Sequence, residues 1–374
     1  MALPAPHIPI ETASRIRVMV VDDSAVIRGL IVRMLERDPG LEIVATCSNG
    51  QMAVYQLARS APDVVILDIE MPVMDGLTAL PKLLAVDPDV KVVIASTLSQ
   101  RNAEISLKAL ALGAADYLPK PSANRLGASE DFHRELLQKV GSLGRRRRTR
   151  AAAVAKPPNT ITFPSHSTSG APIRLRAIGA VAPRLLVIGS STGGPQALTQ
   201  LLMALPANFG APILLAQHMP ATFTPVLAQH LAKVCGRSCR EAVDREPLQS
   251  GHIHLAPGDF HMEVVGDGAR EHLRLSQGPP ENFCRPSVNP LLRSAVRIYG
   301  AQAVAVILTG MGSDGLEGAR DVAAAGGALI AQDEASSVVW GMPGAVATAG
   351  LCSAVLPLKE IAPHVARLFA GTRP

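Results

Sequence analysis

Short apolar runs alternate with amphipathic stretches in two separate parts of the chain. Over residues 15–143, runs such as VMVV, LEIVA, VVIL, VVIA and ADYL are separated by segments such as AVIRGLIVRMLER, which suits an amphipathic helix. From residue 184 onward the alternation returns with LLVIG, ILLAQ, HIHLAP, AVAVILTG and ALIAQ. Strands and helices that alternate in this way are typical of parallel sheets. The pattern therefore predicts two α/β domains.

The composition changes between these two parts. Residues 144–182 are rich in Arg, Pro, Ser and Thr and show no sustained period. We therefore expect a first domain over 14–143, a flexible linker over 144–182 and a second, larger domain over 183–374. A length of 374 residues suits two domains. The arginine run RRRRTR at 145–150 is expected to be a solvated part of the linker rather than a functional basic patch.

The overall composition favours a globular protein of the cytoplasm. Hydrophobic residues make up 48% of the chain, charged residues 18%, and the net charge is +5. The N-terminus lacks a basic start followed by an apolar run, and later apolar stretches are short, so neither a secretion signal nor a membrane span is expected. The odd number of five cysteines, without a CxxC pair, indicates free thiols in a reducing compartment.

Two sets of metal-binding residue types have simpler interpretations. Cys235 and Cys239 are spaced for one helix face, but no second ligand pair stands nearby, so structural thiols are favoured. His252 and His254 alternate along a predicted strand, with His261 soon after. A solvated strand face is favoured there over a metal site, because no carboxylate or thiol is placed to complete one.

Acidic residues follow two strands of the first domain. Asp22 and Asp23 come directly after VMVV, and Asp68 ends VVILD. The carboxyl ends of these strands meet in one crevice of a doubly wound sheet, so the three carboxylates should converge and hold Mg²⁺. A hydroxyl from Ser96, or from its neighbour Thr97, ends the fourth strand, and Lys120 ends the fifth. Both could hold phosphoryl oxygens.

A second set of strand-end residues lies in the larger domain. The turn GSSTGGPQ follows LLVI and precedes a helix, so it exposes Ser190, Ser191 or both at a helix N-terminus, where backbone amides can bind an oxyanion. His218 ends the next strand, and Asp314 lies just beyond a later one. A serine, a histidine and an aspartate at one sheet edge can act as nucleophile, base and orienting acid.

These motifs resemble two known families. The acidic residues, the MPVMDG turn and DYLPKP are similar to the receiver domain of two-component response regulators. GSSTGG, AQHMP, HLAPGDFHM, RPSVNPL, LTGMGSDG and AQDEASSVVWGMP, in that order, resemble the CheB chemotaxis methylesterase family. The resemblance implies a five-stranded, flavodoxin-like parallel receiver followed by a larger doubly wound α/β catalytic domain.

The resemblance also implies roles for individual residues. In the receiver, Asp68 would be phosphorylated, Asp22 and Asp23 would help to hold Mg²⁺, and the switch residues would be Ser96, Tyr117 and Lys120. In the catalytic domain, the nucleophile, base and acid would be Ser191, His218 and Asp314, with the Met311 amide as an oxyanion donor. Ser190 stays open as a competing nucleophile. Ester hydrolysis would need no metal or other cofactor.

The implied activity is hydrolysis of glutamate methyl esters, and deamidation of glutamines, on the cytoplasmic helices of chemoreceptors. A chemotaxis histidine kinase would supply the phosphoryl group, and the unphosphorylated receiver would cover the active site. We expect no nucleic-acid partner, no membrane insertion and a monomer. The alternatives are a nucleic-acid-binding regulator, which predicts a compact helix-turn-helix output domain, and a silent adaptor, which requires a broken triad.

Overall fold

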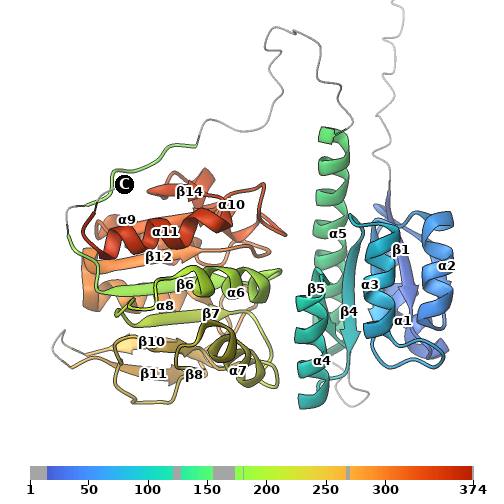
Figure 1. Ribbon diagram of the computed structural model, residues 1–374, viewed down its shortest axis with the longest axis horizontal. Coiled ribbons are helices and arrows are strands. Elements are labelled where there is room, and N and C mark those ends of the chain that lie inside the picture. The colour runs from blue at the N-terminus through green and yellow to red at the C-terminus, as the bar shows by residue number, and fades with distance from the viewer. Residues whose placement is uncertain (1–14, 121–127, 155–172, 180, 267–269, 373–374) are drawn as a thin grey trace, which may run out of the picture.

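The computed structural model describes residues 15–120, 128–154, 173–179, 181–266 and 270–372. Two α/β units lie side by side, one built on a five-stranded sheet and one on a seven-stranded sheet with a separate two-stranded hairpin (Figure 1). The expected fold class is thus confirmed for both halves. None of the helices in the described part of the chain combines the length and apolar character that a bilayer crossing requires.

The first sheet is parallel throughout, in the order β2-β1-β3-β4-β5. Its direction of progression reverses at β1, which lies between β2 and β3. The residues that follow β1 and β3 therefore face one crevice at the carboxyl edge. The strands are β1 (Ile16–Val21), β2 (Leu41–Cys47), β3 (Val64–Asp68), β4 (Lys91–Ser96) and β5 (Asp116–Pro119).

The first four helices of this domain begin at polar caps. In each case the side chain before the helix accepts a hydrogen bond from a backbone N–H of the first turn, which satisfies a donor that the helix leaves free. The caps are Ser24, Asn49, Asp75 and Ser99. The helices are α1 (Ala25–Leu35), α2 (Gly50–Ser60), α3 (Gly76–Val86) and α4 (Gln100–Ala111).

The last helix of the receiver continues into the segment that we expected to be a linker. Helix α5 spans Ala128–Val154, so the first part of 144–182 is helical and not flexible. Residues 155–172 and 180 lie outside the described residues. Residues 173–179 are extended, and within them the Arg176 N–H donates to the Cys352 carbonyl at 2.8 Å. This stretch therefore packs on the second domain.

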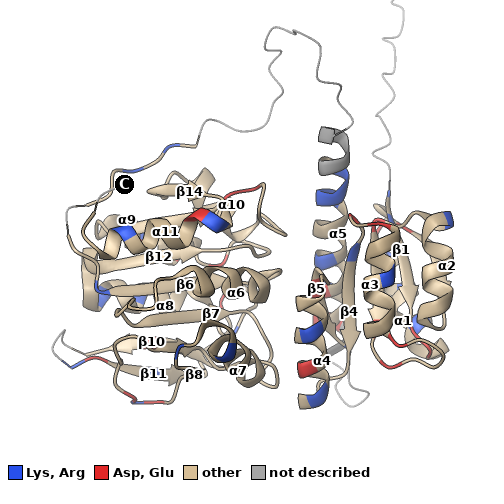
Figure 2. Cartoon of the chain, viewed as in Figure 1, with Lys and Arg blue, Asp and Glu red and all other residues tan. Residues whose placement is uncertain are grey.

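The arginine run lies on α5 (Figure 2), and two of its members, Arg147 and Arg148, are paired with acids rather than solvated, which corrects our expectation for these two. Arg147 Nη2 lies 2.5 Å from Asp87 Oδ2, and Arg148 Nε donates to Asp63 Oδ2 at 2.8 Å. The Arg147 side chain is only 16% exposed. These contacts explain how a stretch without apolar period extends the helix: the cations pack along the acids at the amino edge of the sheet.

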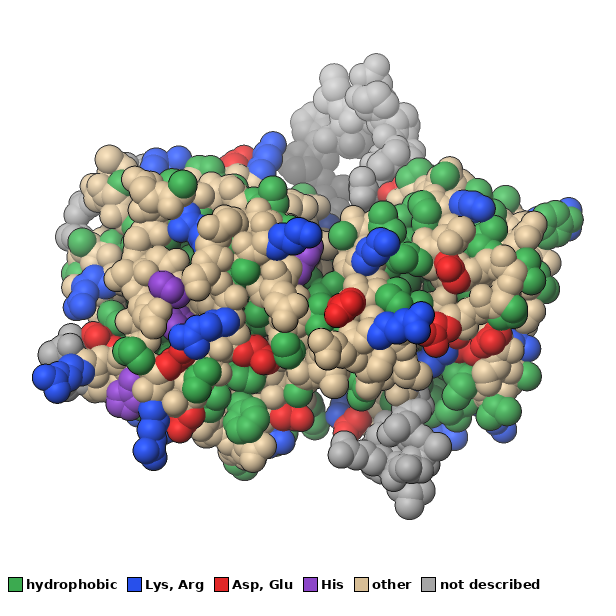
Figure 3. Space-filling model, turned by 60° about the horizontal axis from the view of Figure 1, so that its bottom comes forward, with side chains coloured by type: hydrophobic (Ala, Val, Ile, Leu, Met, Phe, Trp, Pro, Cys, Tyr) green, Lys and Arg blue, Asp and Glu red, His purple; other side chains and the backbone are tan. Residues whose placement is uncertain are grey.

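The charges on the visible surface do not form a nucleic-acid footprint. On the face shown in Figure 3, Lys and Arg side chains are interspersed with Asp and Glu over both domains. Nonspecific nucleic-acid binding depends on a continuous basic patch or stripe. Together with a large α/β sheet in place of a compact output domain, this face gives no support to a nucleic-acid-binding regulator.

The second sheet is also parallel, in the order β14-β13-β12-β6-β7-β9-β8. The hairpin β10-β11 is antiparallel. The chain order reverses between β12 and β6, which again creates a crevice at the carboxyl edge. The strands are β6 (Leu185–Ser190), β7 (Ile213–Gln217), β8 (Cys239–Glu241), β9 (Ile253–Leu255), β10 (His261–Val265), β11 (His272–Ser276), β12 (Ala303–Ile307), β13 (Ala328–Gln332) and β14 (Ala354–Leu356).

Helices cover both faces of this sheet. Along β6, Leu186 and Ile188 face one apolar core, while Leu185 and Val187 face the other, as the alternation of side chains along a strand requires. Both faces are buried, which explains the continuous apolar run LLVI. The helices are α6 (Gly194–Ala204), α7 (Thr224–Cys235), α8 (Val288–Tyr299), α9 (Leu316–Ala324), α10 (Met342–Thr348) and α11 (Leu358–Phe369), with a 3₁₀ turn at Gly300–Gln302.

The close approach of Gly76 to the end of β3 yields a stability prediction. A Cβ atom at Gly76 would lie 2.0 Å from the Asp68 carbonyl oxygen, so Gly76→Ala must displace the strand end that carries Asp68. We expect a loss of about 3 kcal/mol in the unfolding free energy of the receiver. Gly29→Ala is the matched control, because that Cβ meets nothing within 4 Å inside α1. It should stabilise the domain by up to about 1 kcal/mol. Urea denaturation followed by circular dichroism measures the unfolding free energy of both variants. Equal changes in Gly76→Ala and Gly29→Ala would contradict the prediction.

Candidate active site and phosphorylation site

The turn that follows β6 is forced to be tight by two glycines. Gly193 has a φ of +75°, in the left-handed region that favours glycine. A Cβ at Gly194 would lie 2.0 Å from Gln217 Oε1, so only glycine allows α6 to start this close to β7. The turn lifts Ser191 out of the sheet at the N-terminus of α6.

The two serines of the turn have different surroundings. Ser190 is fully buried, and its hydroxyl donates to Gln217 Oε1 at 2.7 Å. Ser191 is half-buried, and within the described residues its hydroxyl makes no hydrogen bond. A nucleophile must be reachable by substrate and free to lose its proton. The geometry therefore favours Ser191 over Ser190.

His218 and Asp314 are brought together as their positions at strand ends predict. His218 Nε2 donates to Asp314 Oδ2 at 2.7 Å. Burial acts to raise the pKa of Asp314, but the hydrogen bond and charge of His218, with the Val288 N–H and the Ser287 hydroxyl, lower it to about 2. The carboxylate is thus ionised at neutral pH and can orient the imidazole. No hydrogen bond in the described residues joins Ser191 to His218.

Several partners of this pair could not be identified from sequence periodicity. Asp314 Oδ1 accepts from the Ser287 hydroxyl at 2.7 Å and from Asn282 Nδ2 at 3.2 Å, while its Oδ2 also accepts from the Val288 N–H at 2.7 Å. Cys284 Sγ lies 3.3 Å from His218 Nδ1. These residues come from the irregular segment between β11 and α8 and from the first residue of α8, where only the RPSVNPL resemblance marked a functional region.

The loop after β12 approaches Ser191 closely at Gly310. A Cβ at Gly310 would lie 2.9 Å from the Ser191 Cβ, so the absence of a side chain there lets the loop approach the nucleophile. The next residue is Met311, whose backbone N–H donates no hydrogen bond within the part of the chain that is described. A free amide at this place can bind a developing oxyanion.

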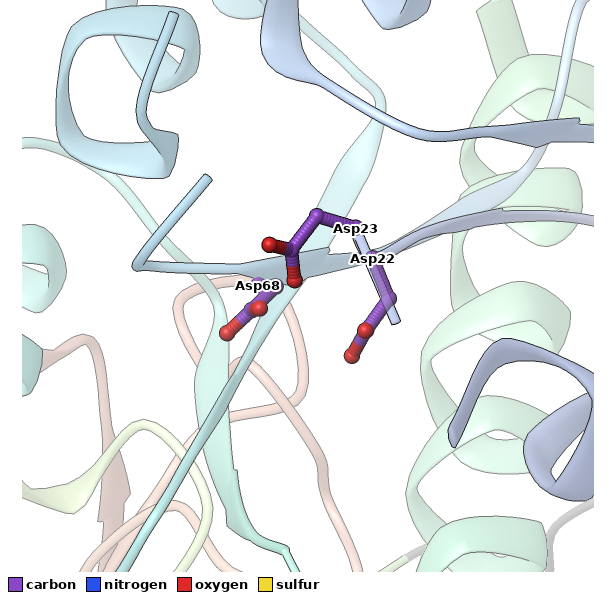
Figure 4. Close-up of side chains that lie close together, drawn as sticks. All are labelled: Asp22, Asp23 and Asp68. Atoms are coloured by element: carbon purple, nitrogen blue, oxygen red, sulfur yellow. The ribbon is translucent and has the colours of Figure 1, made fainter. Parts of the chain in front are cut away.

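The three acids of the receiver converge as expected. Oxygen atoms of Asp22, Asp23 and Asp68 all lie within 4.8 Å of one another (Figure 4). Lys120 Nζ lies 2.7 Å from both Asp22 Oδ2 and Asp68 Oδ1. Burial raises the pKa of Asp68, the neighbouring Lys120 opposes that shift, and Asp22 adds to it. Hard carboxylate oxygens in this number and closeness fit Mg²⁺.

The predicted switch residues occupy two different environments. Ser96 is buried at the end of β4, and its hydroxyl lies 3.1 Å from the Ser106 hydroxyl of α4. The neighbouring Thr97 is exposed and accepts from Asn102 Nδ2 at 2.6 Å. Tyr117 lies on β5 and stacks on Phe223 of the second domain, with ring centroids 4.6 Å apart. The structure thus brings Lys120 to the acids and directs Tyr117 away from them.

The receiver contacts the active-site edge of the second domain through α4, which packs on α6 and α7, and through side chains of β5 and α5 (Figure 1). The hydroxyl of Thr192, the residue after Ser191, donates to Asp116 Oδ2 at 2.7 Å. Lys139 Nζ lies 3.1 Å from the same carboxylate oxygen. Gln196 Nε2 donates to the carbonyls of Leu110 and of Ala114, the latter at 2.9 Å. The turn that carries Ser191 is therefore held directly by the receiver.

The other histidines and cysteines that the structure describes show no metal-binding arrangement. His254 Nδ1 lies 2.9 Å from Glu246 Oε1, and His261 Nε2 lies 3.0 Å from the Pro279 carbonyl. The acidic trio is the one group of metal-ligating side chains found among the described residues. Cys235 and Cys239 are free thiols. His254 and His261 are thus buried and hydrogen-bonded rather than on a solvated strand face, while His252 is half-buried, with Nδ1 3.1 Å from the Ser250 carbonyl oxygen.

Comparisons with known proteins agree with this two-part structure. The family model described as "Response regulator receiver domain" matches residues 18–128, and the one described as "CheB methylesterase" matches residues 186–365. In solved structures, the CheB methylesterase catalytic domain of Thermotoga maritima is 41% identical, covers 50% of this chain and 100% of its own, and has a TM-score of 0.49.

Curated relatives match both domains together. A protein-glutamate methylesterase/protein-glutamine glutaminase of Azospirillum brasilense is 54% identical over 95% of this chain and 93% of its own length. The protein-glutamate methylesterase/protein-glutamine glutaminase 1 of Paramagnetospirillum magneticum is 53% identical over 97% of this chain and 98% of its own length. A receiver joined to an α/β hydrolytic site defines a response regulator with an enzymatic output domain. The chain belongs to the protein-glutamate methylesterase/protein-glutamine glutaminase family, the CheB family.

The different surroundings of the two serines lead to a prediction about stability. Ser190→Ala leaves the buried Gln217 Oε1 without its donor, so we expect a loss of about 1 to 3 kcal/mol in the unfolding free energy. Ser191→Ala removes a half-buried hydroxyl without a partner and should change stability by less than about 0.5 kcal/mol. Chemical denaturation of both variants measures this difference. Equal losses would show that the two hydroxyls are equivalently placed.

Proposed function

We propose that this protein is a phosphorylation-activated methylesterase and deamidase that acts on glutamate methyl esters and on glutamines of chemoreceptor cytoplasmic helices. The observation that carries the proposal is the His218–Asp314 pair at 2.7 Å, at the same sheet edge as the reachable Ser191. An intact set of these three residues argues against a silent adaptor. The family membership of the whole chain supports the substrate class.

Both reactions follow from one arrangement of these residues. Ser191 Oγ attacks the side-chain carbonyl carbon while His218 takes its proton, and Asp314 stabilises the imidazolium. The Met311 N–H donates to the oxygen that becomes negative in the tetrahedral intermediate. His218 then gives this proton to the methoxy oxygen or the amide nitrogen as its bond to carbon breaks, so that methanol or ammonia leaves. Water, deprotonated by His218, hydrolyses the acyl-enzyme and yields glutamate, so this step uses no metal or other cofactor.

In the receiver we propose Asp68 as the acceptor of a phosphoryl group from a histidine kinase. Asp22, Asp23 and Asp68 would hold Mg²⁺, which when bound offsets the negative charge of the carboxylates and the phosphoryl oxygens. Lys120, already 2.7 Å from Asp68, would bind a phosphoryl oxygen, and the Ser96 hydroxyl would turn from Ser106 to another. Tyr117 would change its packing in the same transition.

We propose that phosphorylation acts by weakening the contact between the domains. The unphosphorylated receiver holds Thr192 and Gln196, on either side of the α6 N-terminus, and stacks Tyr117 on Phe223. A phosphoryl group at Asp68 can shift this equilibrium only if it favours the separated arrangement. Lys120 follows β5 directly, and β5 carries Tyr117 and Asp116, so a change at Asp68 and Lys120 can reach the contacts between the domains over a short distance.

The domain limits and setting of the protein are also proposals. The receiver would span 14–143 and the catalytic domain 183–374, with the end of α5 included in the connecting residues 144–182. Free cysteines and a cytoplasmic substrate support a cytoplasmic location. We propose a monomer.

The first test is methanol release from methylated receptor cytoplasmic fragments. We expect turnover by the wild type with Mg²⁺ and a small phosphodonor, and a loss of at least about a thousandfold in Ser191→Ala, because the covalent route is removed. Ser190→Ala, the matched control, should keep most of the activity per folded molecule. Full activity in Ser191→Ala would remove the proposed nucleophile, and no wild-type turnover would refute the proposed function.

A second test addresses the contact between the domains. Gln196→Ala removes two hydrogen bonds to the receiver, so we expect basal methanol release without phosphodonor to rise by up to about tenfold. Gln200→Ala, an exposed glutamine on the same helix, is the control and should leave the rate unchanged. The phosphorylated rates should be the same in all three proteins. A basal rate in Gln196→Ala that equals the wild-type rate would argue against this contact as a brake.

A third test concerns the acids of the receiver. Asp23→Ala removes one of three converging carboxylates while leaving the Lys120 pairs in place. We expect at least about a tenfold weaker Mg²⁺ affinity by calorimetry, since a charged ligand is lost. Glu70→Ala, at another acidic residue just beyond β3, serves as the control. Unchanged Mg²⁺ affinity in Asp23→Ala would contradict the proposed ligand set.

A further inference from the structure

A cysteine occupies the side of the catalytic histidine that faces away from Asp314. Cys284 Sγ lies 3.3 Å from His218 Nδ1 and 3.3 Å from the Asn282 carbonyl. His218 Nε2 is already used by Asp314 at 2.7 Å. Both ring nitrogens therefore have partners, and neither partner is Ser191. The reaction above requires that Nδ1 accept the Ser191 proton, so Cys284 stands at the place that the nucleophile must use.

The position of Cys284 is fixed by a tight turn. The Glu281 and Cys284 backbones exchange hydrogen bonds of 3.2 and 2.9 Å, and the two residues between them, Asn282 and Phe283, have φ values of 51° and 63°. Left-handed conformations at both central positions define a turn in which a bulky Phe is strained. The Phe283 side chain is 78% exposed and lies against the Arg134 guanidinium of α5 in the receiver. The turn therefore connects the receiver to the histidine.

The other charged groups around the turn have partners other than the imidazole. Arg293 of α8 pairs with Glu281, and Arg285 Nη1 donates to the Gln277 and Gly278 carbonyls at 3.2 and 3.0 Å. His261 of β10 accepts from the Ser287 N–H. Arg134 of α5 lies over Phe283. The groups that act directly on the imidazole are thus Asp314 and Cys284.

The electrostatics agree with this geometry. Burial acts to lower the pKa of His218, but the charge of Cys284 and the hydrogen bonds with Asp314 and Cys284 outweigh burial and raise it to about 10. An imidazolium at neutral pH cannot accept the serine proton. Because the pKa of His218 is raised, its imidazole becomes available as a base only as the pH rises, or once Cys284 no longer lies at Nδ1.

We propose that Cys284 is a positioning residue that shares a proton with His218 and sets the pH at which this base becomes available to Ser191. The proton moves from Sγ to Nδ1, giving a thiolate and an imidazolium without change in net charge. Ser191 can transfer its proton only after this pair has lost its proton to solvent or Cys284 has left Nδ1. The inference rests on the proposed function, because it assigns His218 as the base.

The first experiment measures the Cys284–His218 pair with a readout that does not depend on esterase activity. In the Ser191→Ala chain, iodoacetamide alkylates thiolates, and mass spectrometry quantifies alkylation at Cys284. We expect Cys284 to react at near-neutral pH, and the additional substitution His218→Gln to slow this reaction at neutral pH by at least about tenfold, because the thiolate loses its counterion. Alkylation whose rate and pH dependence are the same with and without His218 would overturn the proposal.

The second experiment measures the pH profile of kcat/KM for methanol release, with phosphodonor and Mg²⁺ present. Removing the thiolate in Cys284→Ala should move the acid limb of the profile to lower pH by about one unit or more. Cys284→Ser should move it likewise, because a hydroxyl of similar size stays neutral. Cys235→Ala, a half-buried thiol at the end of α7, should leave the profile unchanged.

A purely structural role for Cys284 would lower the rates without moving the acid limb, and an unmoved limb in both Cys284 variants overturns the proposal. The two experiments also separate this inference from the proposed function. If wild-type turnover is absent but His218→Gln slows alkylation, the proposed function fails while the Cys284–His218 pair stands.

Discussion

The buried carboxylate of Asp314 is the point on which the catalytic domain is organised. It is 1% exposed and accepts four hydrogen bonds, from Asn282, Ser287, Val288 and His218. A charge at this depth is tolerated only if its oxygens are fully hydrogen-bonded, so the donors cannot move independently of it. The carboxylate thereby fixes the start of α8, the irregular segment before it and the plane of the imidazole. The positions of these groups therefore follow from the hydrogen bonds that one buried carboxylate requires.

Much of the fold and the main site residues could be predicted because strand periodicity also locates strand ends. The apolar runs end at Ser190, Gln217 and Ile307, and the next residues or the following loops carry Ser191, His218 and Asp314. In a parallel sheet these ends share an edge, so the residues come to one edge even though they are far apart in sequence, and His218 contacts Asp314 there. The same reasoning brought the three receiver acids together.

Other features depended on contacts that have no local signal. Cys284 and Asn282 lie in an irregular segment, and nothing in their spacing indicates that the chain returns to His218 there. The extension of α5 was missed because four arginines give no apolar period. Their partners are far away in sequence, because Asp63 precedes β3 and Asp87 follows α3. Only the folded domain brings these acids to the helix.

The contact between the receiver and the turn that carries Ser191 does not have to be strong in itself. Thr192, Gln196 and Phe223 meet partners that belong to the same polypeptide, so their association is intramolecular. A tether holds its ends at effective concentrations of about millimolar, which offsets much of the entropy lost in association. A few hydrogen bonds and one stacked ring pair can then keep the domains together. Under the regulation that we propose, the receiver would act as a weak inhibitor at saturating concentration, and a modest change in its affinity would release it.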